Sequence, residues 1–428
     1  MAGTLRLALI GLGTVGSSVL AILNDVAGLD LRLGAVQVVA AAVRDLTKAR
    51  NGPLPPLYED ALALACRPDI DVVVEVMGGV ELPYQLLKAA LKAGKHVITA
   101  NKALLARHGE ELFALARTQN RQLRYEAAVG GGIPLLQPIE QCLGANHIQA
   151  VTAIINGTTN YILTQMATRQ IAYEEALAEA QSLGYAEADP RADVEGNDAQ
   201  EKLTLLAALA FRTPLPDLAA VYREGITAVA LPDVMNAQQL GFAIKLLAIA
   251  TRTADGRLDL RVHPTLVPLD HPLSRVDGAY NAVLIQAEPV GSIMFYGPGA
   301  GGGPTASAVV SDIINILADA PTGAIPPASE AAPLHYLPIT AVQTRFYIRL
   351  RALDQPGVIG HIGQIFGQHA VSLASIVQKN PRGAAAELVI ITHDVPEARL
   401  RAALAELRAS AVVQEFCTAI RVLPEGKR

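Results

Sequence analysis

The chain contains 428 residues, of which 35 are lysine or arginine and 40 are aspartate or glutamate, so its net charge is −5. A chain of this length accommodates about three domains and can bury sizeable cores without disulfides or metals. The mild acidity argues against a nucleic acid or an anionic membrane as the main partner. Hydrophobic residues make up 51% of the chain and charged residues 18%, which excludes extensive disorder.

Three cysteines, Cys66, Cys142 and Cys417, lie far apart and form no CxxC motif. This spacing excludes a disulfide framework and a zinc site visible in the sequence, and it fits a reducing cytosol. We therefore expect a cytoplasmic protein. The longest uncharged run, residues 141–168, contains many Asn, Gln and Thr residues and would cross a bilayer poorly, so we expect no membrane segment.

Short apolar runs alternate with helical patterns in the first part of the chain. The predicted strands are residues 4–10, 36–43, 71–76 and 96–99. Nearly continuous apolar runs are typical of parallel strands that are covered on both faces. The segment of residues 81–93 has a helical pattern between two of them. We predict an α/β domain with a doubly wound parallel sheet of Rossmann type over residues 1–130.

The middle of the chain has a different pattern, which indicates an α+β domain over residues 131–303. Its predicted strands are residues 147–155, 280–288 and 292–296, and its predicted helices are residues 158–168, 173–183 and 198–211. Residues 304–318 form one more predicted helix, with Pro304 at a plausible first position, and this helix (about 304–320) is expected to complete the first domain.

Residues 321–344 are rich in proline and alanine and are predicted to be a linker. The remaining residues, 345–428, follow a β-α-β-β-α-β order, which is typical of a small ferredoxin-like domain.

The first predicted strand runs directly into Gly11-Leu12-Gly13-Thr14-Val15-Gly16, which matches GxGxxG and precedes a helical pattern. Glycines permit a tight turn and a close backbone approach, and the helix N-terminus offers N–H groups to a pyrophosphate. This context predicts a dinucleotide site, although a glycine turn without a ligand is the alternative.

The second predicted strand ends at Arg44 and Asp45. An acidic residue at this place binds the ribose of NAD, whereas an arginine favours the 2′-phosphate of NADP. Because Arg44 comes first, the sequence favours NADP, and NAD remains possible through Asp45. An exposed, ion-pairing arginine is the structural alternative.

Acidic residues are concentrated in residues 184–202, among them Glu187, Asp189, Asp193, Glu195 and Asp198. They predict either a site for a cation or a substrate ammonium, or a solvated loop. Asp198 and Lys202 are four residues apart and share one helix face. A lysine held by a carboxylate is a candidate proton donor, and an ordinary surface ion pair is the alternative.

Asn156-Gly157-Thr158-Thr159-Asn160 joins a predicted strand to a predicted helix. Its hydroxyl and N–H groups could bind a carboxylate, or they could only cap the helix.

These motifs, in this order, resemble the homoserine dehydrogenase family. The resemblance covers about residues 4–320 and is carried by GLGTVG, EVMGG at 75–79, ANK at 100–102, VGGGIP at 129–134, NGTTNYIL at 156–163, GYAEADPRADVEGNDAQEK at 184–202 and MFYGPGAGGGPTASAVV at 294–310. The tail, with LDQPGV at 353–358 and GQHAVS at 367–372, resembles an ACT regulatory domain. Together they resemble the monofunctional form that carries an ACT domain.

The resemblance implies reversible, NAD(P)H-dependent reduction of L-aspartate 4-semialdehyde to L-homoserine, a step in threonine, methionine and isoleucine biosynthesis. Two alternatives are another amino-acid-type NAD(P) oxidoreductase on the same plan and a non-catalytic nucleotide or metabolite sensor. A sensor need not keep a proton donor, so the set of candidate catalytic residues counts against it.

The resemblance also implies roles for single residues. Lys202 would be the proton donor, Asp198 would position it, and Lys102 would lie between cofactor and substrate. The implied substrate-binding residues are Glu187, Thr158, Gly157 and Tyr185. The implied cofactor-binding residues are Gly11, Leu12, Gly13, Thr14, Val15, Gly16, Arg44, Gly78, Lys102 and Gly303.

Family members also bind an alkali cation such as Na⁺ or K⁺, mostly through backbone carbonyls. By position these would be the carbonyls of Glu126, Val129, Gly131 and Ile133. The resemblance further implies a homo-oligomer and an amino-acid effector, threonine, at the ACT domain.

Overall fold

The structure is a computed structural model, and it describes residues 4–50, 52–318, 335–382 and 385–424. The described residues form two compact units, each assembled from three stretches of the chain. The first unit takes those within Met1–Val151, Asp198–Val221 and Tyr280–Leu334. The second takes those within Thr152–Asn197, Tyr222–Ala279 and His335–Arg428.

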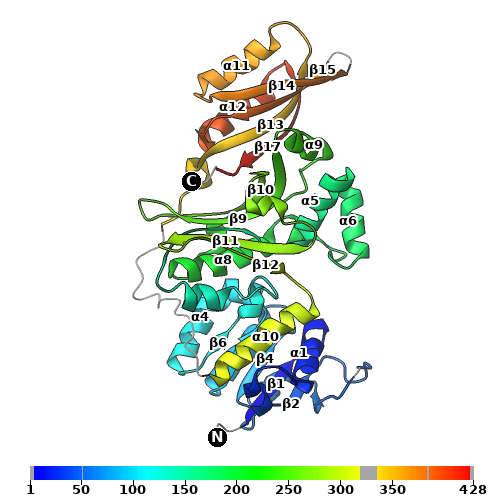
Figure 1. Cartoon of the computed structure of the whole chain (residues 1–428), viewed down its shortest axis with the longest axis vertical. Coiled ribbons are helices and arrows are strands. Elements are labelled where there is room, and N and C mark those ends of the chain that lie inside the picture. The colour runs from blue at the N-terminus through cyan, green and yellow to red at the C-terminus, as the bar shows by residue number, and fades with distance from the viewer. Residues whose placement is uncertain (1–3, 51, 319–334, 383–384, 425–428) are drawn as a thin grey trace. The chain divides into compact units, whose positions relative to one another are not determined.

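The first unit contains a parallel sheet in the order β3-β2-β1-β4-β5-β6 (Figure 1). Its strands are β1 (Leu5–Ile10), β2 (Val36–Ala42), β3 (Leu57–Tyr58), β4 (Val72–Glu75), β5 (His96–Thr99) and β6 (Leu123–Arg124). The helices around it are α1 (Thr14–Asn24), α2 (Ala61–Ala65), α3 (Glu81–Lys92), α4 (Lys102–Thr118) and α10 (Gly302–Leu317). The predicted doubly wound sheet is confirmed. Its strand order reverses between β1 and β4, which is where such sheets bind their ligands.

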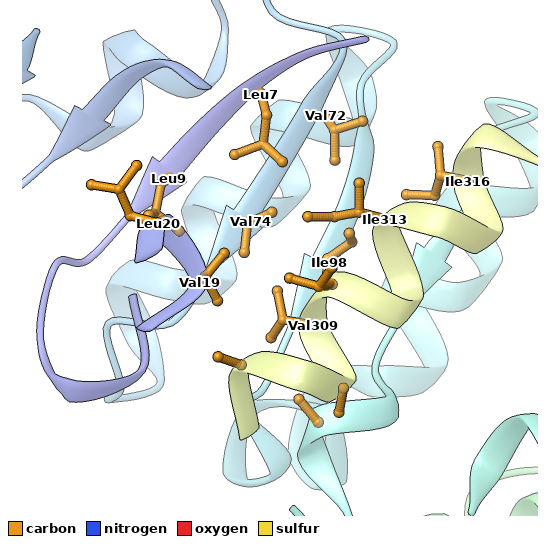
Figure 2. Packing of buried hydrophobic residues seen from close by; sticks show 14 of the residues in the cluster. Leu7, Leu9, Val19, Leu20, Val72, Val74, Ile98, Val309, Ile313 and Ile316 are labelled. Atoms are coloured by element: carbon orange, nitrogen blue, oxygen red, sulfur yellow. The ribbon is translucent and has the colours of Figure 1, made fainter. Parts of the chain in front are cut away.

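The apolar core of this unit lies between the sheet and helices α1 and α10. Leu7, Val74 and Ile98 of the sheet pack in one cluster with Val309 and Ile313 of α10 (Figure 2). Burial of each such side chain contributes about 1.5–3 kcal/mol, which ties this distant helix to the N-terminal strands.

The helix predicted at residues 304–318 is therefore confirmed, but it begins earlier than expected. α10 starts at Gly302, so Pro304 lies within the first turn and not at its first position. Amides of the first turn have no intrahelical acceptor, so proline costs no helical hydrogen bond there.

The strand predicted at residues 36–43 is shorter and less buried than expected. It ends at Ala42, and residues 36–39 are partly exposed, whereas residues 40–42 are buried. The neighbouring strand β3 has only two residues and pairs with Ala41 and Ala42 alone. The first half of β2 is therefore an edge and lacks cover on one side.

The chain also contains β7 (His147–Ile154), α8 (Asn197–Phe211) and an antiparallel hairpin of β11 (Tyr280–Glu288) and β12 (Gly291–Pro298). The hairpin belongs to the first unit and confirms the two strands predicted there.

The second unit contains a sheet in the order β9-β10-β17-β13-β15-β14, with β8 beside β10 and β16 beside β13. Its strands are β8 (Tyr222–Arg223), β9 (Phe242–Arg252), β10 (Leu258–Pro268), β13 (Gln343–Leu353), β14 (Leu373–Arg382), β15 (Ala385–Thr392), β16 (Val395–Pro396) and β17 (Val413–Val422). Its helices are α5 (Gly157–Arg169), α6 (Tyr173–Ser182), α7 (Arg191–Val194), α9 (Leu231–Gln239), α11 (Val358–Gln368) and α12 (Glu397–Ala409). Within the described ranges, none of the helices has the length and apolar character needed to span a bilayer.

The C-terminal part confirms the predicted β-α-β-β-α-β order, given by β13, α11, β14, β15, α12 and β17. Its core includes Ile348, Leu350, Phe366 and Leu404. Most of the predicted linker lies outside the described residues. Its described end is ordered, because the backbone of residues 335–337 bonds to Leu258 and β13 begins at Gln343.

Candidate active site

The glycine turn joins β1 to α1 at the point where the strand order reverses. Gly11 has a φ of +104°, and a Cβ atom on it would lie 2.9 Å from the carbonyl oxygen of Val76. A Cβ atom on Gly16 would lie 1.9 Å from the carbonyl oxygen of Gly11. Around Gly13, by contrast, a Cβ atom would meet nothing within 4 Å. The turn is therefore closed on its protein side and open at Gly13, which suits the approach of a pyrophosphate to the N-terminus of α1.

Two other predicted cofactor residues lie in the same unit. Gly78 has a φ of +76° in the loop after β4, and the space around its Cβ position is open. Gly303 is in the first turn of α10 and is also open, whereas a Cβ on the preceding Gly302 would lie 2.8 Å from Ser18 Oγ of α1. α10 therefore begins directly against the helix that follows the glycine turn.

The two candidates for cofactor selection, Arg44 and Asp45, follow β2 and are both exposed. Asp45 is engaged locally, since its Oδ1 accepts hydrogen bonds from the Thr47 amide at 2.8 Å and the Thr47 hydroxyl at 2.6 Å. The hydrogen bonds from Thr47 lower the pKa of the Asp45 carboxyl. Arg44 is thus exposed, while one oxygen of Asp45 is occupied by Thr47.

Three predicted catalytic residues come together in the first unit. Lys202 Nζ lies 2.8 Å from Asp198 Oδ2, and Lys102 Nζ lies 3.2 Å from Asp198 Oδ1. Asp198 and Lys202 are only 8% and 9% exposed, whereas the side chain of Lys102 is 33% exposed. An ordinary surface ion pair is therefore the wrong interpretation of the Asp198–Lys202 spacing. One buried carboxylate orients two ammonium groups.

Local sequence explains the geometry of this trio. α8 places Asp198 and Lys202 on one face, because residues four apart are neighbours on a helix. Lys102 is the first residue of α4, and the Asn101 side chain caps that helix by accepting the amide of Leu104 at 3.1 Å. The sequence motif included Asn101, but only the structure gives it this capping role.

The predicted substrate-binding residues belong to the second unit. The Thr158 hydroxyl donates to the Tyr185 carbonyl at 2.6 Å, and the helix is capped by Asn156, whose Oδ1 accepts the Thr159 amide at 2.8 Å. Thr158 is thus not the cap, and its oxygen can still accept a hydrogen bond. A Cβ atom on Gly157 would lie 2.8 Å from the Ala279 carbonyl oxygen, so the start of α5 requires glycine.

The acidic segment serves several purposes. Asp189 forms an exposed ion pair with Arg191, as the solvated-loop alternative expects. Asp193 accepts a hydrogen bond from Asn156 Nδ2 at 2.7 Å and so supports the cap of α5. Glu187 is exposed, with its backbone carbonyl bonded to Gln181.

Glu126, Val129, Gly131 and Ile133, the predicted cation ligands, lie in one compact turn of the first unit. Gly130 and Gly131 have φ values of +77° and +57°, and a Cβ on Gly131 would lie 2.3 Å from the Gly299 carbonyl oxygen. The carboxylate of Glu126 accepts hydrogen bonds from three backbone amides. The backbone amide of Glu126 donates to the buried carboxylate of Asp312 at 2.9 Å. Within the described ranges, no three His, Cys, Asp or Glu side chains gather as a metal site.

A doubly wound sheet, an open glycine turn at its switch point and a buried lysine held by a carboxylate define an NAD(P)-dependent oxidoreductase. Family models match the chain in three parts: homoserine dehydrogenase, NAD binding domain, at residues 11–126, homoserine dehydrogenase at residues 134–314, and ACT domain at residues 346–411.

Individual relatives agree with these models. The chain is 48% identical over 434 residues to a homoserine dehydrogenase of Synechocystis, covering 98% of this chain and 100% of the relative. A solved homoserine dehydrogenase from Thiobacillus denitrificans has a TM-score of 0.92 at 40% identity and covers 98% of both chains. A hyperthermophilic archaeal homoserine dehydrogenase in complex with NADPH has a TM-score of 0.63 at 26% identity, covering 75% of this chain and 99% of the other.

The chain belongs to the homoserine dehydrogenase family and carries an ACT domain. Its activity is the reversible NAD(P)H-dependent reduction of L-aspartate 4-semialdehyde to L-homoserine, which confirms the activity that the resemblance implies.

Proposed function

We propose that Lys202 is the proton donor of this reaction. When bound, the nicotinamide cofactor supplies the hydride that reduces the aldehyde carbon. Negative charge then develops on the aldehyde oxygen. An ammonium at this oxygen stabilises the charge and gives up one proton, so that the aldehyde becomes an alcohol. The buried contact of 2.8 Å between Lys202 and Asp198 is the observation that carries this assignment.

Asp198 holds both amines in this proposal. Because its second oxygen contacts Lys102 at 3.2 Å, the carboxylate still has a cationic partner after Lys202 has lost its proton. In this proposal Lys102 lies between the cofactor and the substrate. Thr158 and the amides at the start of α5 bind the substrate carboxylate, and Glu187 and Tyr185 bind elsewhere on the substrate, with Glu187 facing its ammonium.

NADP is the proposed cofactor, because Arg44 is exposed and Asp45 is engaged with Thr47. We expect Arg44→Ala to lower kcat/KM for NADPH by about 10- to 100-fold, the effect of losing a charge-assisted hydrogen bond. The value for NADH should barely change. Initial rates with each cofactor measure this, and Arg32→Ala is the control, because that exposed arginine pairs with Asp30 before β2. Equal losses with both cofactors would contradict the role of Arg44.

An alkali cation, Na⁺ or K⁺, is proposed at the turn that holds Glu126, Val129, Gly131 and Ile133. Its carbonyl oxygens would hold the ion, because hard cations prefer oxygen ligands, and the buried Glu126 side chain holds the turn through hydrogen bonds from three backbone amides. The proposed role of the ion is to fix this turn.

We also propose a homo-oligomer and a cytoplasmic location. Tyr280 and Tyr296 stack on the exposed side of the β11–β12 hairpin, with Met294 also exposed, and a second copy of the chain would cover this apolar face. The three cysteines are free, which suits a reducing compartment. Threonine is the proposed effector of the ACT domain.

One set of initial rates tests the proposal as a whole. The purified protein should oxidise NADPH faster than NADH with L-aspartate 4-semialdehyde, and threonine should slow the reaction. Faster oxidation with a different aldehyde from a panel would assign another substrate. No oxidation with any aldehyde would contradict an enzymatic role.

A further inference from the structure

Glu75 is a fully buried carboxylate at the end of β4, and the chemistry proposed above does not use it. Its Oε1 accepts the amides of Met77 at 2.9 Å and Gly78 at 3.3 Å. Its Oε2 accepts the hydroxyl of Thr99 at 2.6 Å. Burial raises the pKa of Glu75, and the hydrogen bonds from Thr99, Met77 and Gly78 oppose this rise. A buried carboxylate with three convergent donors is costly to place, so a functional reason for it is expected.

One branch of this network leads to the start of α4. The Thr99 oxygen accepts the amide of Asn101 at 3.0 Å, so the hydroxyl hydrogen is directed to Glu75. Asn101 Nδ2 donates to the Gly79 carbonyl at 2.7 Å, and Asn101 Oδ1 caps the helix whose first residue is Lys102. Glu75 is therefore connected through two hydrogen bonds to the residue that sets the position of Lys102.

The other branch leads to the glycine turn. The two amides bonded to Glu75 belong to the loop of residues 77–79, and Gly78 and Gly79 hold positive φ values with open space around them. The preceding residue, Val76, bonds to the Ile10 carbonyl at 2.9 Å and packs against Gly11. The loop is thus fixed directly beside the turn that is proposed to hold the pyrophosphate.

We propose that Glu75 is a positioning residue for the reaction, which sets the 77–79 loop for cofactor binding and the first turn of α4 for the contact between Lys102 and Asp198. The second half of this inference rests on the proposed role of Lys102. The same carboxylate serves both, so a change at Glu75 affects cofactor affinity and turnover together.

The network requires a carboxylate of this length. In a Glu75→Gln variant the amide oxygen can still accept Met77 and Gly78, but the NH₂ group then faces Thr99, whose hydroxyl hydrogen loses its acceptor. Aspartate is shorter by one C–C bond of about 1.5 Å, so it cannot reach the amides and Thr99 together.

Four variants test the inference: Glu75→Gln, Thr99→Val, Thr99→Ser and the control Lys95→Met. Lys95 is buried next to the start of β5, the same strand whose end carries Thr99, and it donates to the Ile70 carbonyl at 2.8 Å. Glu75→Gln and Thr99→Val should each raise the Kd for NADPH and lower kcat, by about tenfold or more, which corresponds to the loss of one hydrogen bond to a charged group. Thr99→Ser keeps the hydroxyl and should stay close to the parent chain. Lys95→Met should lower the Tm only.

Calorimetric titration with NADPH gives Kd without turnover, and steady-state rates give kcat and KM. An unchanged Kd and kcat in Glu75→Gln would overturn the inference, and so would equal kinetic losses in Lys95→Met at the same drop in Tm. A higher Kd with an unchanged kcat would support positioning of the 77–79 loop and would contradict the role of Lys102, so the two failures can be distinguished.

Discussion

Replacement of Lys202 by alanine is expected to lower kcat by about 10²- to 10⁴-fold, the usual contribution of a positioned proton donor. The affinity for NADPH should change little, because the glycine turn and α10 remain intact. Asp198 keeps Lys102 as a cationic partner at 3.2 Å, so the variant should fold. Steady-state rates with aspartate semialdehyde and calorimetric titration with NADPH measure the two quantities.

Lys202→Arg separates proton transfer from charge. Arginine keeps the positive charge but does not give up a proton in proteins, so this variant should be nearly as inactive as Lys202→Ala. Lys92→Ala is the control, since Lys92 lies at the exposed end of α3. Substantial turnover by Lys202→Arg would assign only charge stabilisation to this residue, and near-normal turnover by Lys202→Ala would remove its assignment.

The sequence predicts β1, β4 and β5 well because these strands are short, apolar and buried, whereas β3 and β6 have only two residues each and show no pattern. Leu7, Val74 and Ile98 are the residues that both the pattern and the core require. The candidate catalytic residues were predictable for a different reason. Asp198 and Lys202 are neighbours on one helix, and the family resemblance added Lys102. Their burial depends on packing by distant residues and was not visible in the sequence.

The sequence pattern predicts no element in residues 212–279, yet they contain α9, β9 and β10. These strands carry buried charges that hide the apolar pattern. Lys245 of β9 pairs with Asp277, and Arg261 of β10 lies 3.4 Å from Asp259. Lys245 is tolerated inside the sheet because its Nζ donates hydrogen bonds to Asn160, Val276 and Asp277, and local sequence does not reveal these distant partners.

The C-terminal domain illustrates the same limit. Its order of elements was predictable from alternating strands and an amphipathic helix. The attachment of this domain to α9 was not predictable. Asp233 of α9 is completely buried and forms a bidentate ion pair with Arg349 of β13, at 2.6 and 3.1 Å. These two residues lie far apart in the sequence. This pair links the ACT sheet to α9, which also bonds to the end of α5 through Gln238.

The second large effect is expected from replacement of Gly16 by alanine, which should lower both the stability and the affinity for NADPH. Alanine there places a Cβ atom 1.9 Å from the Gly11 carbonyl oxygen. The oxygen is a backbone atom and the backbone fixes the position of the Cβ, so no flexible side chain can move away. The turn must open. We expect the free energy of unfolding to fall by about 1–3 kcal/mol, the usual cost of overpacking, and the affinity for NADPH to fall at least about tenfold because the amides at the start of α1 are displaced.

Gly13→Ala provides the informative contrast, because its Cβ would meet no protein atom within 4 Å and its φ of −81° suits alanine. If the pyrophosphate lies at this opening, the added methyl group occupies the ligand's space, so NADPH affinity should fall while the unfolding free energy stays within about 0.5 kcal/mol. Gly34→Ala, in equally open space before β2, should change neither quantity. Urea unfolding and NADPH titration of the three variants give both numbers. Tight NADPH binding by Gly13→Ala would place the cofactor elsewhere. The open space at Gly13 would then not be the place where the pyrophosphate binds.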